Sequence, residues 1–108
     1  MIDLSQITGF DWDEGNSRKS LEKHSVTQIE AEQVFVDEHL ILALDVAHSR
    51  DEERFYAFGM TARGRQLQLS FTIRGHGTLI RVVSARDMSG KEKRRYAQEG
   101  KDDSEVQE

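Results

Sequence analysis

Three strand-like stretches lie in a row between Arg54 and Ala85, and they constrain the fold more than any other part of the chain. In the middle stretch apolar and polar side chains alternate strictly, with Leu67, Leu69, Phe71 and Ile73 on one face and Gln66, Gln68, Ser70, Thr72 and Arg74 on the other. This period of two residues predicts a strand with one face against the core. Gly75-His76-Gly77 predicts a tight hairpin, and residues 78–85 are apolar on both faces, as central strands are. These segments predict a sheet of antiparallel strands at the centre of the fold.

Capping signals predict three helices. Thr27-Gln28-Ile29-Glu30 is a capping box, which predicts a helix that ends near residues 36–37. Asp13 is the expected N-cap of a weaker first helix through about Lys23. Ser89-Gly90-Lys91-Glu92 is a second capping box, and it predicts a last helix to about Glu99, with Gly100 as its stop.

Two further strands complete the prediction, one with alternating leucines at residues 40–46 and a short edge strand at residues 10–12. Residues 47–53 are expected to form a polar loop. The order is then β-α-α-β-β-β-β-α, which is an α+β fold with one antiparallel sheet packed against helices. We expect residues 1–9 to be an N-terminal arm, residues 10–100 to be one domain and residues 101–108 to be an acidic flexible tail.

The composition excludes several classes of protein. The chain has no cysteine, so disulfides and thiol chemistry are excluded, and its four histidines lack the spacing of a metal site. It has no apolar run of about 18 residues and no signal-peptide pattern, which predicts a cytoplasmic protein without a membrane span. The net charge is −5, yet residues 81–96 carry a net +4 and residues 97–108 a net −4. Because salt screens charges over about 10 Å, the basic segment can still bind an anion.

Arginines in the predicted strands are the first candidates for chemistry. If alternation is strict in the last strand, Arg81 projects with Val83 and Ala85, and Arg86 projects from the opposite face. An arginine among valines either forms an ion pair with a carboxylate or lines an anion site, and both interpretations stay open. Arg74 belongs to the polar face of its own strand.

The last predicted helix concentrates cations at Lys91, Lys93, Arg94 and Arg95. They form either a solvated face or a surface for a negative partner, which is an RNA backbone or an acidic protein segment. Tyr96 either packs the helix on the sheet or takes part in base stacking or proton transfer. His24 follows Lys23 at the expected end of the first helix, where it is either a structural group or a catalytic one.

Motifs spread over residues 10–96 resemble those of the BrnT family, the toxin halves of type II toxin–antitoxin pairs. They are Phe10-Asp11-Trp12-Asp13, Lys23-His24-Ser25-Val26, residues 30–37 (EAEQVFVD), Glu53-Arg54 with Gly59, Gly64-Arg65, Thr72-Ile73-Arg74-Gly75, residues 80–86 (IRVVSAR), and Glu92 with Tyr96. The chain departs from the family in its first helix, which often has Lys and Asn where this chain has Asn16 and Ser20. Many members also have histidine at the position of Phe71.

The resemblance implies a RelE-like fold and a metal-independent endoribonuclease, without a cofactor, that cleaves RNA and arrests translation and growth. It also implies a cognate BrnA-like ribbon-helix-helix antitoxin, which neutralises the toxin and binds operator DNA. For the site, the resemblance implies roles for Arg86 and Tyr96, which occupy matching positions. We expect Arg74, Arg81 and Arg86 to act as phosphate clamps, with Tyr96 and His24 as groups for proton transfer or base stacking. Further RNA contacts are expected from Lys23, Arg54, Arg65, Lys91, Arg94 and Arg95.

Two other functions stay open at this point. The chain could be a non-catalytic module whose basic C-terminal helix docks an acidic segment of a partner protein. A nuclease is expected to arrest growth and to cut RNA in the presence of EDTA, whereas a binding module does neither. A DNA-binding regulator is disfavoured, because the chain lacks a helix-turn-helix signal and is acidic overall.

Overall fold

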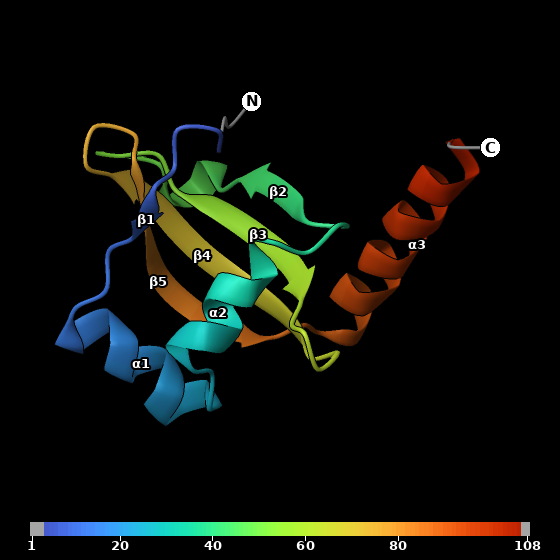
Figure 1. The fold of residues 1–108 in the computed structure, drawn as a ribbon, viewed down its shortest axis with the longest axis horizontal. Helices are drawn as coiled ribbons and strands as arrows, with labels where there is room; N and C mark the ends of the chain where they lie inside the picture. Colours follow the sequence, from blue (N-terminus) through green and yellow to red (C-terminus); the bar gives the residue numbers. More distant parts are fainter. Residues whose placement is uncertain (1–3, 107–108) are drawn as a thin grey trace.

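The computed structural model of the chain describes residues 4–106, apart from the side chains of Ser20 and of residues 100–106. Its elements are β1 (Gly9–Phe10), α1 (Glu14–His24), α2 (Gln28–Val34), β2 (Ile41–Leu44), the 3-10 helix η1 (Val46–His48), β3 (Phe55–Met60), β4 (Gln66–Arg74), β5 (Leu79–Asp87) and α3 (Gly90–Val106). This series confirms the expected α+β order and adds only η1. The five strands form one sheet in the order β1-β5-β4-β3-β2 (Figure 1).

The sheet is mixed, although one wholly antiparallel sheet was expected. Strands β2 to β5 pair antiparallel in sequence order, as the hairpin signals predict. Strand β1 instead pairs in parallel with β5, and Phe10 lies opposite Ile80. The prediction is wrong at this edge because alternation within a strand does not encode the direction of a distant partner. In the segment before β1, Leu4 and Ile7 contact the core.

Helices α1 and α2 cover one face of the sheet and bury the core against it (Figure 1). Strand β4 contributes Leu67, Leu69 and Phe71, which have no exposed surface, so its apolar face is the one predicted. Gly59 in β3 allows α2 to approach, because a Cβ at this position would lie only 2.9 Å from Val34. A histidine in place of Phe71 would have to be buried in this core.

Both predicted capping boxes are present. The Thr27 hydroxyl accepts the N–H of Glu30 at 3.1 Å, and the Glu30 carboxylate accepts the N–H of Thr27 at 3.0 Å. Ser89 and Glu92 form the same reciprocal pair at 3.2 Å and 2.8 Å. Helix α2 ends at Val34, slightly before the expected position. Helix α3 continues to Val106, so the predicted stop at residue 100 is wrong, since a glycine weakens a helix by only about 1 kcal/mol and does not by itself end it. None of the helices in the described part of the chain is long and apolar enough to cross a membrane.

A β-bulge in β5 decides which way its arginines point. The pairing with β4 skips Val83, which is therefore an extra residue in the strand. Val82 before the bulge and Ala85 after it are both buried in the core, because the extra residue reverses the alternation. Strict alternation predicted Arg81 and Arg86 on opposite faces. That prediction is wrong, and the bulge places both arginines on the same face.

Candidate functional site

The sheet face turned away from α1 and α2, which we call the open face, carries the three arginines predicted as phosphate clamps. The register pairs Thr72 with Arg81 and Gln68 with Arg86, and paired residues project from the same face. Arg74 comes two residues after Thr72 in β4, so it projects from this face as well. The structure therefore brings these three predicted site residues to one surface.

A fourth arginine, Arg54, joins them immediately before β3. The N–H of Asp45 donates to the carbonyl of Arg54 at 2.8 Å, which extends the β2–β3 ladder by one residue. Because Phe55 pairs with Phe71, the next position places Arg54 opposite Thr72. Nε of Arg54 and Oγ1 of Thr72 are buried, and neither has a hydrogen-bond partner within the part of the chain that the structure describes. Such groups cost about 1–3 kcal/mol when unpaired.

The other three arginines of the open face form ion pairs with carboxylates. The pairs are Arg81 with Asp13 (2.8 Å) and Asp11 (3.5 Å), Arg74 with Glu52 (2.8 Å), and Arg86 with Glu92 (2.8 Å). A backbone hydrogen bond at Asn16 and the guanidinium of Arg81 lower the pKa of Asp13. The three arginine side chains remain between 22% and 46% exposed, so a phosphate oxygen can reach them from solvent.

An aspartate–histidine pair that the sequence patterns did not single out lies at the end of β2. Nδ1 of His48 is 2.9 Å from Oδ2 of Asp45. Asp45 is only 5% exposed, whereas the side chain of His48 is 61% exposed. Burial acts to raise the pKa of Asp45, but hydrogen bonds with His48 and Tyr56 outweigh it, so the pKa lies below its usual value. The available signal was the three-residue spacing of the two side chains, where the strand expected at residues 40–46 meets the polar loop expected at residues 47–53.

A pocket of about 390 Å³ opens beside this pair, in the loop between β2 and β3. Its walls are formed by Ala47, His48, Arg50, Asp51, Glu52 and Arg54. The guanidinium of Arg74 donates two hydrogen bonds to Glu52, at 2.8 Å and 3.1 Å, which neutralises that carboxylate. Arg50 and Arg54 then outweigh Asp51, so the pocket favours an anion.

Three predicted site residues, Tyr96, His24 and Lys23, are not brought to the open face. Tyr96 is 6% exposed, and its hydroxyl donates to Oδ2 of Asp37. Oδ2 of Asp37 lies on the side of the sheet that α1 and α2 cover. It is close to Gly59 in β3, where a Cβ would be only 3.2 Å away from it. Burial and the Asp37 carboxylate raise the pKa of Tyr96, so its hydroxyl stays protonated. His24 and Lys23 are exposed at the C-terminal end of α1, which packs on the same covered side.

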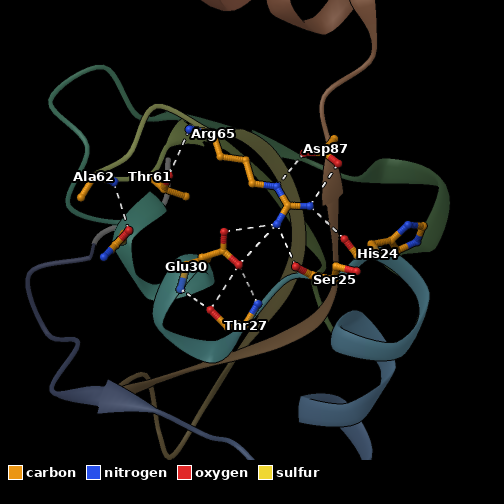
Figure 2. A network of polar contacts seen from close by, with 9 residues as sticks. His24, Ser25, Thr27, Glu30, Thr61, Ala62, Arg65 and Asp87 are labelled. Carbon is orange, nitrogen blue, oxygen red and sulfur yellow. Dashed lines mark hydrogen bonds and ion pairs between the residues drawn. The ribbon is translucent and has the colours of Figure 1, made fainter.

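Arg65, a predicted RNA contact, is surrounded by acceptors of its own chain (Figure 2). Nε and Nη2 donate to the two carboxylate oxygens of Asp87, at 2.8 Å and 3.1 Å. Nη2 also donates to the carbonyl of His24, and Nη1 donates to the carbonyl of Ser25 and to the Glu30 carboxylate. All five N–H groups of this guanidinium are therefore used, and Arg65 connects α1, α2 and β5.

The predicted RNA contacts on α3 lie on an exposed surface. Arg95 pairs with Glu99 at 3.1 Å, one helical turn away. Among the side chains that the structure describes, Lys91, Lys93 and Arg94 form no ion pair. All three cations are exposed and can meet a negative partner.

No group of three or more His, Asp or Glu residues within residues 4–99 is placed to hold a metal ion. A protein-family model matches residues 12–92, and its description is ribonuclease toxin, BrnT, of type II toxin–antitoxin system. This range contains the four arginines of the open face and the pair Asp45–His48, whereas Tyr96 lies beyond it. A search among curated proteins gives no match.

Proposed function

Since the chain belongs to the BrnT family of ribonuclease toxins of type II toxin–antitoxin systems, we propose that it is a RelE-like, metal-independent endoribonuclease that arrests translation and growth. Cleavage of RNA requires groups that hold the scissile phosphate, groups that stabilise its developing charge, and a group that accepts a proton. The open face offers candidates for the first two tasks on a single surface.

The observation that carries this proposal is the gathering of Arg54, Arg74, Arg81 and Arg86 on the open face. In the proposed reaction, a ribose 2′-hydroxyl attacks the adjacent phosphorus and gives a 2′,3′-cyclic phosphate and a 5′-hydroxyl. The phosphate gains negative charge in the transition state, and each well-placed guanidinium can contribute about 10²–10³-fold to the rate. No step of this route uses a metal ion.

The carboxylates that pair with the arginines support the same proposal, because they orient the guanidinium groups before RNA binds. Asp13 contacts Arg81 at 2.8 Å, and its other oxygen accepts the N–H of Asn16 at 3.0 Å. The side chain of Asn16 in turn donates to the carbonyl of Val82 in β5, at 3.0 Å. Arg81 is thus held relative to its own strand, and charges fixed in advance need no reorganisation during the reaction.

We also propose that α3 is part of the surface recognised by a cognate antitoxin, a BrnA-like protein with a ribbon-helix-helix domain that binds operator DNA. Membership of a type II toxin family implies an antitoxin partner. The exposed cations Lys91, Lys93 and Arg94, which form no ion pair within the described residues, suit an acidic segment of that partner. The same observation favours the second candidate function, in which the chain is a non-catalytic module that binds an acidic segment through α3.

Expression without the antitoxin tests the proposal. We expect growth arrest, and we expect the purified chain to cut single-stranded RNA in excess EDTA and to leave cyclic phosphate ends. Arg54→Gln is expected to lower kcat/KM by about 10²-fold or more, whereas Arg63→Gln on the exposed β3–β4 turn leaves it unchanged. A chain that binds the antitoxin but neither arrests growth nor cuts RNA would establish the binding module instead.

A further inference from the structure

We infer that His48 is the catalytic base of RNA cleavage and that Asp45 is its positioning residue, so that the scissile phosphodiester lies in the pocket formed by residues 47–54. This inference rests on the proposed ribonuclease function and adds the group that moves the proton. The arginines of the open face cannot act as this base, because a guanidinium keeps its proton in proteins. The cleavage site therefore needs a separate acceptor.

Asp45 holds the imidazole of His48 in the tautomer that a base needs. Its Oδ2 lies 2.9 Å from Nδ1, so the carboxylate accepts the Nδ1–H and leaves the lone pair of Nε2 free. The lowered pKa of Asp45 means that its carboxylate is ionised at neutral pH. His48 lines the pocket and remains 61% exposed, so a ribose hydroxyl can reach it.

Asp45 precedes a helical turn, and its carboxylate is directed mainly at other side chains. It occupies the N-cap position of η1, yet its side chain makes no capping hydrogen bond. Its carboxylate interacts instead with His48 and with the hydroxyl of Tyr56. Tyr56 in turn lies within the electrostatic reach of Arg86 and Arg54. Asp45 thus interacts both with the histidine of the pocket and with a tyrosine near the arginines of the open face.

Ser49 keeps the two ends of the pocket loop together. Its hydroxyl donates to the carbonyl of Asp45 at 2.6 Å and accepts the N–H of Arg54 at 2.9 Å. The Ser49 side chain thus connects Asp45, which orients His48, to Arg54, which lines the pocket. Groups fixed in this way are suited to hold a reacting phosphate near a base.

Size and charge both suit a phosphodiester with its ribose. Pockets for small ligands usually measure about 300–1,000 Å³, and this pocket measures about 390 Å³. The titratable and charged groups around His48 are Asp45 and Tyr56 on the strand side and Arg50, Asp51, Glu52 and Arg54 in the pocket. Because Arg74 pairs with Glu52 and Asp45 pairs with His48, the guanidinium groups of Arg50 and Arg54 remain to face a phosphate.

In the assigned step, Nε2 of His48 accepts the proton of the 2′-hydroxyl while the bond from O2′ to phosphorus forms. The bond from phosphorus to O5′ breaks, and the departing oxygen takes a proton from water. The imidazolium then gives its proton to the hydroxide left behind, which restores the neutral histidine. Arg54 faces the same pocket and is placed to stabilise the charge on the phosphate.

The test compares the wild-type chain, His48→Gln and Asp45→Asn on a short RNA oligonucleotide across a series of pH values. His76→Gln, on the exposed β4–β5 turn, is the matched control and keeps the wild-type rate. We expect His48→Gln to lower kcat by about 10²–10⁴-fold with KM nearly unchanged, and to abolish the fall in rate on the acid side of the profile. Asp45→Asn is expected to lower kcat as well, with KM nearly unchanged, because the imidazole loses the carboxylate that holds its Nδ1–H.

Imidazole added to His48→Ala separates a lost base from a damaged fold, since restored cleavage requires an intact site. The assignment is overturned if His48→Gln keeps the wild-type rate and acid limb while Arg54→Gln abolishes cleavage. That result would leave the proposed ribonuclease function standing. If the wild-type chain cuts no RNA, the ribonuclease function fails, and the assignment of His48 fails with it.

Discussion

Replacing Arg65 with methionine separates a structural role of this arginine from a role in RNA binding. Methionine keeps an unbranched, flexible stem but removes every N–H donor. Asp87 and Glu30 lose their cationic partner, and the carbonyls of His24 and Ser25 lose their donor. The contacts between α1, α2 and β5 that Figure 2 shows are broken together.

The cost follows from the exposure of the groups involved. Loss of one partner from a buried ion pair costs about 3–5 kcal/mol, whereas an exposed pair contributes about 0–1 kcal/mol. The side chains of Arg65 and Glu30 are 26% and 28% exposed, and that of Asp87 is 59% exposed, so an intermediate value applies. We expect the free energy of unfolding to fall by about 2–3 kcal/mol out of a total of about 5–15 kcal/mol, and Tm to fall by about 10 °C or more.

Urea and thermal unfolding followed by circular dichroism measure this change. Arg18→Met is the matched control, because Arg18 pairs only with Glu14 in the described part of the chain, and these side chains are 65% and 77% exposed. This control is expected to cost less than about 0.5 kcal/mol. The structural interpretation of Arg65 is refuted if Arg65→Met costs no more than Arg18→Met, above all if it weakens RNA binding at the same time.

Two further predictions concern groups on the covered side of the sheet. Tyr96→Phe removes the hydrogen bond to Asp37 and is expected to cost about 1–2 kcal/mol in thermal unfolding, with unchanged RNA cleavage. Loss of cleavage in a fully folded Tyr96→Phe would instead support the predicted catalytic role. The second prediction is that acid destabilises the wild-type chain more than it destabilises Arg65→Met. A backbone hydrogen bond at Thr27 and the Arg65 guanidinium lower the pKa of Glu30, and the Arg65 guanidinium also lowers the pKa of Asp87. These carboxylates stabilise the fold above their unfolded pKa values of 4.5 and 3.8, and the stabilisation is lost as the pH falls through the lowered folded values. Urea unfolding at a series of pH values measures the free energy of unfolding of both chains. An equal loss of stability in acid for the two chains would contradict the prediction.

Local patterns predicted those parts of the fold that depend on neighbours in the sequence. Alternation assigned both faces of β4 correctly, because its apolar residues form the core and its polar residues face away from it. The capping boxes at Thr27 and Ser89 marked helix starts, since their hydrogen bonds span only three residues. The stop predicted at residue 100 failed because a glycine in an exposed helix permits an end without imposing one.

The candidate site depended on features that no local pattern encodes. Val83 is an ordinary strand residue in the sequence, and only its lack of a partner in β4 makes it a bulge. This one residue decides that Arg81 and Arg86 share a face. The contact of Asp45 with His48 is local, but its importance depends on burial of the aspartate, on Tyr56 from another strand and on the adjoining pocket.

The arginines of this acidic chain differ in how many of their N–H groups donate hydrogen bonds within the chain. Arg65 has none left, so it stabilises the fold. Arg86 donates to Glu92 and to the carbonyl of Asp87, and Arg81 donates to Asp13, so both are oriented but remain partly exposed. Arg54 has a buried Nε with no partner in the described residues, beside the pocket that His48 lines. The net charge of −5 therefore does not oppose RNA binding at the open face. Many of the carboxylates already pair with arginines, and Arg50 and Arg54 still line one pocket.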